Sequence, residues 1–157
     1  MTAFLSPLRC EYVPPWEYMN EGWNDNDGTD RWQLTEPFKF HSDVLHKTDE
    51  VPFGFRFDKA SVPTLPVIYA NFGGRYTRAA CIHDWLCRMQ RVERKKADLV
   101  FLEFMRFENS QELQAMYAAG VDDDDIADRK ASLEGRAQMM YAAVALYTKT
   151  GLWKLWK

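Results

Sequence analysis

The sequence predicts an α+β fold, in which a small antiparallel sheet packs against three main helices. Aromatic residues alternate with polar residues or glycine from about Phe38 to Phe57, and this two-residue period is typical of strands. From Arg78 onward, apolar residues recur every three or four positions, which is the period of amphipathic helices. We therefore expect the strands to come first and the helices to cap the sheet.

The length and the net charge of the chain limit the classes of protein to which it can belong. A chain of 157 residues is long enough for one domain with a real core. Within it we distinguish an aromatic N-terminal extension (1–36), a sheet with a helix pair (37–105) and a helical C-terminal part (106–157). A net charge of -3 gives no pull toward nucleic acid. No apolar run reaches membrane-spanning length and no signal segment opens the chain, so we expect a soluble protein that a signal peptide does not export.

The strand region contains Phe38 and Phe40, and then Phe53, Phe55 and Phe57, at alternating positions. Asp58 and Ser61 follow in a turn, because Pro63 forces the residue before it into an extended conformation. Both side chains are suited to a catalytic or binding site, although in such turns they more often form local hydrogen bonds with backbone amides. The loop ends at Thr77, a predicted N-cap for the next helix.

The first helix is predicted from about Arg78 to Met89. Ile82, Trp85, Leu86 and Met89 lie on one face, and small residues fill most of its remaining circumference. We therefore expect this helix to be buried on nearly all sides. His83 and Asp84 lie on it, and such a helix offers them little water.

The second helix carries a carboxylate where its pattern requires an apolar residue. Asp98 shares one stripe with Phe101, Leu102 and Met105. A buried carboxylate is costly unless it is paired, hydrogen-bonded or bound to a metal, so Asp98 requires a partner. The loop at about 90–93 is short enough to make the two helices antiparallel, so that His83 or Asp84 can meet Asp98.

The C-terminal part is predicted to be helical. A weaker helical stretch ends at Gly120, and acidic residues then precede a helix from roughly Ile126 to Lys149, with Gly151 as its stop. The tail carries Trp153 and Trp156 among lysines. Aromatic residues there are typical of a docking surface or of a covered domain edge.

Five segments together resemble one protein family. They are Val51–Phe55, Phe57–Pro63, Ala79–Leu86, Ala97–Asp98 and Met140–Val144. Their residues and order are similar to the pattern of a phage and prophage family, the domain of unknown function numbered 1353. The resemblance implies a viral or prophage origin, and hence the bacterial host cytoplasm or the virion as the location. It implies no established activity.

The residues favour two classes of enzyme. In the first, a metal-dependent hydrolase, Asp58, His83, Asp84 and Asp98 hold Zn, Mn or Mg, and Ser61 orients the substrate. A bound divalent ion lowers the pKa of water and so generates a nucleophile. In the second class, Ser61 is the nucleophile, His83 is its base, and Asp84 or Asp98 orients the imidazole.

A non-enzymatic interpretation uses the same residues as structure. In it, His83 is bonded to Asp98 only to fix the helix pair to the sheet. The protein is then a virion assembly or host-interaction protein. Its docking surfaces are the aromatic N-terminal segment and the tail with Trp153 and Trp156.

Overall fold

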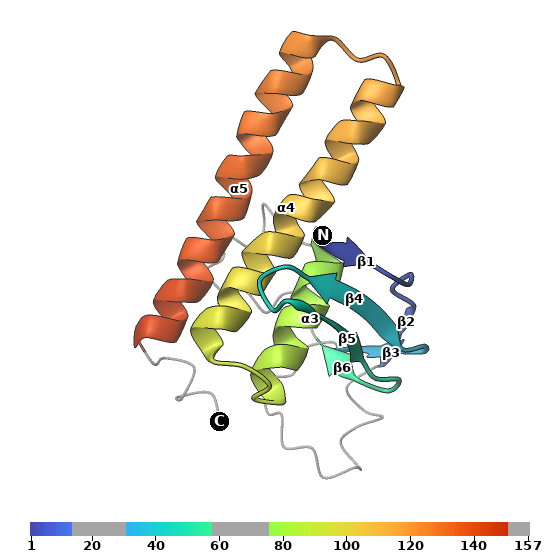
Figure 1. Cartoon of the computed structure of the whole chain (residues 1–157), viewed down its shortest axis with the longest axis vertical. Coiled ribbons are helices and arrows are strands. Elements are labelled where there is room, and N and C mark those ends of the chain that lie inside the picture. The colour runs from blue at the N-terminus through green and yellow to red at the C-terminus, as the bar shows by residue number, and fades with distance from the viewer. Residues whose placement is uncertain (14–30, 58–75, 151–157) are drawn as a thin grey trace.

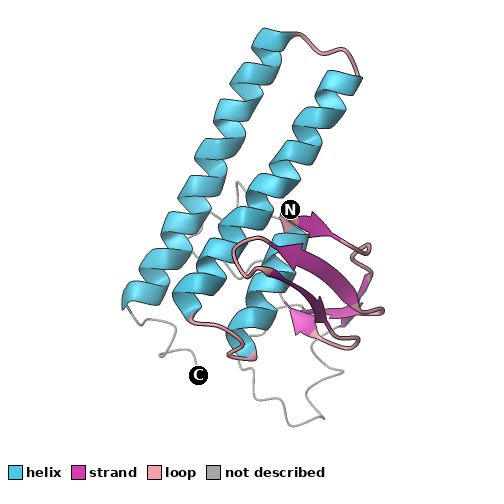
Figure 2. Ribbon diagram, in the orientation of Figure 1, coloured by secondary structure: helices cyan, strands magenta, loops and turns pink. Residues whose placement is uncertain are grey.

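The computed structural model describes residues 1–13, 31–57 and 76–150. Its elements follow the predicted order of strands first and helices afterwards (Figure 1). Figure 2 shows the strands gathered on one side of the helices, and strands β5 (Lys47–Val51) and β6 (Arg56–Phe57) contact helix α3 (Thr77–Arg88). The α+β class with three main helices is therefore confirmed.

Within residues 1–13 and 31–57, the strands form two antiparallel sheets of three strands each. One has the order β1 (Ala3–Phe4), β4 (Phe38–Ser42), β5 (Lys47–Val51). The other has the order β2 (Cys10–Val13), β3 (Arg31–Leu34), β6 (Arg56–Phe57). The N-terminal extension thus supplies strands to both sheets, and the sheet residues are not confined to the segment from Phe38 to Phe57.

A turn separates β5 from β6, which belong to different sheets. Gly54 has φ +78°, and the amide of Phe55 donates to the carbonyl of Pro52 at 3.3 Å. Glycine adopts this left-handed conformation without a steric penalty. The two-residue alternation that is typical of a strand therefore does not continue through Phe53. Phe53 is 65% exposed, whereas Phe55 and Phe57 are buried. The prediction that Phe53 belongs to a strand was wrong.

In the part of the chain that the structure describes, the helices are α3 (Thr77–Arg88), α4 (Arg94–Ala118) and α5 (Asp123–Thr150). As predicted, α3 is buried nearly all round, since every residue from Ala79 to Leu86 is buried. The predicted N-cap was wrong by one residue. Tyr76 occupies that position in the left-handed conformation, with φ 63°, and no side chain caps the helix.

The middle helix, α4, packs against α3 on one side and α5 on the other (Figure 1). A buried polar chain crosses all three helical segments. The hydroxyl of Tyr76 donates to Asn109 Oδ1 at 2.8 Å, and Asn109 Nδ2 donates to the carbonyl of Leu133 at 3.2 Å. These bonds satisfy polar groups in a region where an unpaired group costs about 1–3 kcal/mol.

Glu103 of α4 fixes the first sheet to the helices. Its Oε1 accepts hydrogen bonds from the amides of Asp43 and Val44 and from the hydroxyl of Thr2, at 2.7, 3.2 and 2.6 Å. Its Oε2 accepts from the hydroxyl of Ser42 at 2.5 Å. One carboxylate therefore holds the β4–β5 turn and the start of the chain.

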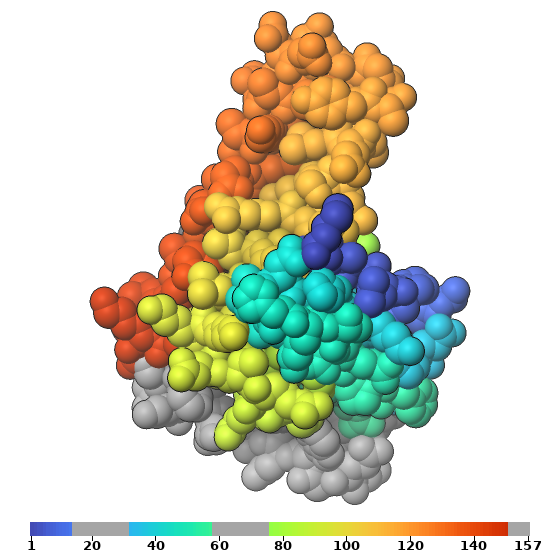
Figure 3. Space-filling view, viewed as in Figure 1, coloured from blue at the N-terminus to red at the C-terminus, as the bar shows by residue number. Residues whose placement is uncertain are grey.

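The far halves of α4 and α5 form a helical hairpin that extends beyond the rest of the molecule (Figure 3). Two ion pairs, Arg106 with Glu134 and Arg129 with Glu112, join its helices. The turn between them follows Gly120, which has φ +72°. Among the described helices, none has a stretch long and apolar enough to cross a membrane.

Candidate functional site

The antiparallel arrangement of α3 and α4 places His83 against Asp98. The imidazole Nε2 of His83 and the carboxylate Oδ1 of Asp98 lie 2.9 Å apart, which is hydrogen-bond distance. Only 4% of the His83 side chain and 2% of the Asp98 side chain are exposed. The carboxylate that interrupts the apolar stripe of α4 thus has the partner that its burial requires.

Neighbouring side chains hold the imidazole in place. The ring of Phe101, three residues after Asp98 on α4, lies 5.1 Å from the ring of His83, centroid to centroid. Cys87, one turn after His83 on α3, places its Sγ 3.5 Å from the same Nε2. Nε2 therefore faces both a carboxylate oxygen and a sulfur atom.

The surroundings change the proton affinity of His83. Burial alone lowers the pKa of His83, but the hydrogen bonds to Asp98 and Cys87 raise it, and the net result is a pKa of about 10 instead of the ordinary 6.5. At neutral pH the ring is therefore an imidazolium. It forms a buried ion pair with the Asp98 carboxylate.

Asp84 lies beside the pair and is also buried, at 6% exposure. The charge of Asp84 contributes to the raised pKa of His83. It also raises the pKa of the Cys81 thiol, although burial is the main cause of that shift. Two carboxylates thus act on His83. Asp98 is the one whose oxygen lies at hydrogen-bond distance from Nε2, at 2.9 Å.

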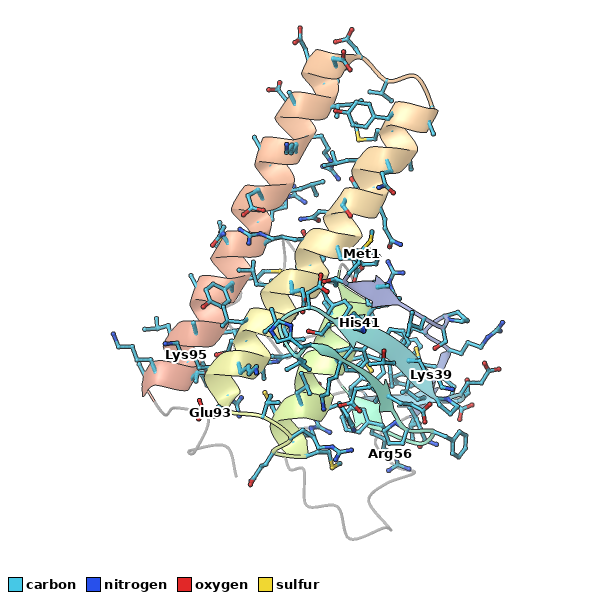
Figure 4. The ribbon with its side chains drawn as sticks, viewed as in Figure 1. Met1, Lys39, His41, Arg56, Glu93 and Lys95 are labelled. Carbon is cyan, nitrogen blue, oxygen red and sulfur yellow. The ribbon has the colours of Figure 1, made fainter. Side chains whose placement is uncertain are left out.

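The other two histidines lie outside this cluster. His41, labelled in Figure 4, lies on β4, where its Nδ1 is 3.1 Å from the hydroxyl of Thr48. His46 is exposed in the turn that follows, with φ 53°. Of the three histidines in the chain, only His83 is buried.

Comparison with known protein families assigns this region of the chain. Residues 32–120 match the family model DUF1353, which is described as a protein of unknown function. The chain belongs to the DUF1353 family. No curated protein and no solved structure matches the chain.

The matched DUF1353 region runs from β3 through α4, so it contains His83, Cys87 and Asp98. It leaves β1, β2 and α5 outside. The candidate site therefore belongs to the part of the chain that defines the family. Met140–Val144, the fifth segment of the resemblance, lies in α5 and therefore beyond the match.

The remaining predicted site residues of this DUF1353 member are Asp58 and Ser61. Both lie outside the described residues, so their predicted proximity to His83 stays a prediction. Within residues 1–13, 31–57 and 76–150, no three side chains of His, Cys, Asp or Glu form a group that could hold a metal ion. A site that also uses Asp58 is not tested by this observation.

Sequence reasoning missed Cys87 as a member of the cluster. It counted Cys87 among the small residues that fill the helix circumference, although its i+4 spacing from His83 puts the two on one helix face. That spacing was the available signal. A thiol four residues after a buried histidine lies within reach of the imidazole.

Proposed function

We propose that this DUF1353 member is a hydrolase and that His83 and Asp98 form its acid–base pair. The observation that carries the proposal is the 2.9 Å contact between His83 Nε2 and Asp98 Oδ1. A carboxylate that binds one imidazole nitrogen fixes the tautomer and orientation of the ring, so that the other nitrogen is the proton acceptor. This is the arrangement that general-base catalysis requires.

The chemistry assigned to each residue follows from this arrangement. Neutral His83 keeps its proton on Nε2, where it donates to Asp98. Nδ1 accepts the proton of an attacking water or hydroxyl group as that group adds to the scissile centre. Asp98 stabilises the resulting imidazolium, and the same proton is later delivered to the leaving group.

The raised pKa of His83 has a consequence for this reaction. A base with a pKa of about 10 is mostly protonated at pH 7, and only its neutral form accepts a proton. Hydrolysis should therefore be slow at neutral pH and should increase as the pH approaches 10. An alkaline pH profile is thus the signature of this proposal.

Metal dependence and the role of Ser61 remain separate predictions within the same proposal. The metal-dependent version adds Asp58, Asp84 and a Zn, Mn or Mg ion, and the metal-free version adds Ser61 as the nucleophile. Neither rests on a described contact. Both predict loss of activity when the pair is broken, so the first experiment addresses His83 and Asp98.

The test uses chromogenic substrates of two classes, p-nitrophenyl acyl esters and bis-p-nitrophenyl phosphate. Wild type, His83→Gln, Asp98→Asn and the control Asp128→Asn are assayed from pH 7 to pH 10, with EDTA and with added Zn, Mn or Mg. Asp128 is an exposed residue of α5, so its substitution makes the same chemical change away from the pair. We expect activity in wild type and control only, rising with pH.

Equal rates in all four proteins would attribute the hydrolysis to a contaminant and overturn the proposal. Activity of wild type that disappears with EDTA would select the metal-dependent version. If folded wild type hydrolyses neither class of substrate at any pH, the His83–Asp98 pair does not catalyse these reactions and a structural role for it is favoured. The second candidate function is then favoured.

The second candidate is a virion assembly or host-interaction protein of phage or prophage origin. The observation that favours it is the α4–α5 hairpin, which extends beyond the rest of the molecule (Figure 3). Near its tip, Tyr117 in the last turn of α4 is 59% exposed, and farther along α5, toward the body of the protein, Met139 and Leu146 are 54% and 61% exposed. Exposed apolar side chains on a protruding element suit contacts with a partner protein.

This candidate is tested by detecting the chain in particles purified after induction of the producing host. Wild type should be present in the particles, and Tyr117→Asp should reduce its incorporation without lowering its melting temperature. Absence of the wild-type chain from purified particles would exclude a virion role.

A further inference from the structure

We propose that this protein forms a dimer in which the outer face of α5 packs in antiparallel orientation against the same face of a second copy. The partner is a second copy because the charges at the two ends of the α4–α5 hairpin complement each other when two such hairpins run in opposite directions. This self-association requires neither hydrolase activity nor incorporation into particles.

One side of α5 packs on α4, and another side is open to solvent. The buried residues of α5 follow one another at spacings of three, four or seven positions and are Ile126, Leu133, Ala137, Met140 and Val144. Met139 and Leu146 lie away from this buried side and are 54% and 61% exposed. Gly135 and Ala142 are also exposed, at spacings of four and three from Met139. Gly135, Met139, Ala142 and Leu146 therefore form one apolar outer stripe along the helix.

Gly135 lies inside α5, where glycine is less favourable than alanine because it loses more backbone entropy on folding. In the part of the chain that the structure describes, a Cβ atom at this position would meet no atom within 4 Å. The packing of one chain therefore does not require a glycine here. A second helix that approaches the backbone closely does favour one.

The two ends of the hairpin carry opposite charges. The end next to the turn after α4 carries Asp122–Asp125, with Asp128 one turn farther along α5. The other end carries Arg94–Lys96 at the start of α4 and Lys149 in the last turn of α5. Figure 4 shows Lys95 at this end, together with the acidic Glu93. Parallel pairing would bring like charges together, whereas antiparallel pairing places the acidic end of each copy beside the basic end of the other.

The spacing of these residues is nearly symmetric about Met139. Gly135 lies four residues before it and Ala142 three residues after it, while Asp128 lies eleven before it and Lys149 ten after it. A two-fold axis near Met139 therefore places Met139 beside its own copy. The same axis pairs Gly135 with Ala142 and Asp128 with Lys149 of the second copy. Each contact occurs twice in such an interface, so the assembly closes as a dimer.

The first experiment measures the mass in solution by analytical ultracentrifugation over a dilution series. We expect wild type to change from the 18.4 kDa monomer to a dimer of twice this mass as the concentration rises. Met139→Lys places two like charges at the axis and should weaken dimerisation about tenfold. Phe53→Lys is the matched control, because Phe53 is 65% exposed in the turn after β5, and it should dimerise as wild type does.

Charge reversal tests the predicted pairing of Asp128 with Lys149. Asp128→Lys turns both of these contacts into repulsion and should weaken dimerisation about fivefold. Lys149→Asp in the same chain should restore it. Lys130→Asp is the control, because Lys130 is an exposed residue of α5 that lies two positions from Asp128 and so on another side of the helix. It should have little effect.

Disulfide formation under mild oxidation tests the orientation directly, with wild type as the background for the native cysteines. Met139→Cys lies at the proposed axis and should give a disulfide-linked dimer. Leu146→Cys lies seven residues from the axis, so its two copies are about 20 Å apart in an antiparallel dimer and cannot bond. The proposal is overturned if wild type stays monomeric at every concentration, if Met139→Lys dimerises like wild type, or if Leu146→Cys links as readily as Met139→Cys.

Discussion

Asp98 Oδ1 and His83 Nε2 are 2.9 Å apart although their residues belong to different helices and both side chains are buried. Removing two charges from water costs several kcal/mol per ion, and a close, hydrogen-bonded contact recovers much of that cost. The contact therefore links α3 to α4 at one fixed register. Any change that removes one charge leaves the other buried without compensation.

The pair makes stability depend on pH in a defined window. The pKa of His83 rises from 6.5 to about 10 on folding, so the folded state binds the proton more tightly than the unfolded chain does. This contribution is fully present below pH 6.5 and is lost as the pH rises from 6.5 to about 10. The expected loss is on the order of a few kcal/mol.

The measurement is the free energy of unfolding in urea at pH 7, 8.5 and 10. Wild type should lose stability across the series, and folded His83→Gln should lose much less, because it lacks the titrating group. A wild-type stability that is flat or increases from pH 7 to 10 would show that His83 is not held as an imidazolium.

Asp98→Asn distinguishes an ion pair from a metal site. If the pair is an ion pair, loss of the carboxylate removes the group that keeps the buried imidazole protonated, and the variant should be destabilised by about 3 kcal/mol. If Asp98 is a metal ligand, its buried charge destabilises the metal-free protein. The Asp98→Asn variant should then be as stable as wild type or more stable. The two expectations have opposite signs.

Melting temperatures are measured for wild type, Asp98→Asn and the control Asp128→Asn, each with EDTA and with added Zn, Mn or Mg. We expect only Asp98→Asn to melt markedly lower, and we expect no metal to change the result. A metal that binds the folded state raises its melting temperature by mass action. A metal that raises the melting temperature of wild type and not that of Asp98→Asn would instead support Asp98 as a metal ligand.

The His83–Asp98 contact could be predicted because a single residue violated a clear pattern. Asp98 occupies an apolar stripe, and the short loop between the helices restricts its partner to the preceding helix. The same reasoning could not identify Cys87, since a thiol is compatible with either a buried or a half-exposed position. The hydrophobic pattern gives no signal for such a residue, so only the spacing of four positions between His83 and Cys87 could have identified the contact.

The sheets show where pattern analysis reaches its limit. Strands β1 and β6 are two residues long, and two residues cannot display a period. Their positions depend on pairing with β4 and β3, which is information from distant parts of the chain. Phe53 shows the opposite error, because its spacing matched a strand although Gly54 turns the backbone there.

Tyr76→Phe tests the buried polar chain that joins the helices. The hydroxyl donates to Asn109 Oδ1, and its removal leaves that oxygen buried with no donor from Tyr76. We expect destabilisation of about 1–2 kcal/mol, measured by urea unfolding. Tyr117→Phe is the matched control, because Tyr117 is 59% exposed, and it should change stability by less than about 0.5 kcal/mol. Equal effects of both substitutions would contradict the interpretation.

Glu103→Gln tests whether one carboxylate holds the β4–β5 turn. Glu103 accepts hydrogen bonds from two amides and two hydroxyls, so all four of these partners are donors. A glutamine can place its amide oxygen at the Oε1 position, toward three donors, and its NH₂ group at the Oε2 position, where the Ser42 hydroxyl must then accept instead of donate. The negative charge that strengthens all four hydrogen bonds is lost. We expect a loss of about 2 kcal/mol and faster hydrogen exchange at the amides of Asp43 and Val44.

Glu134→Gln, which breaks an exposed pair with Arg106, should leave those two amides as protected as in wild type. Unchanged exchange at Asp43 and Val44 in Glu103→Gln would show that the turn is held by its own backbone and not by α4.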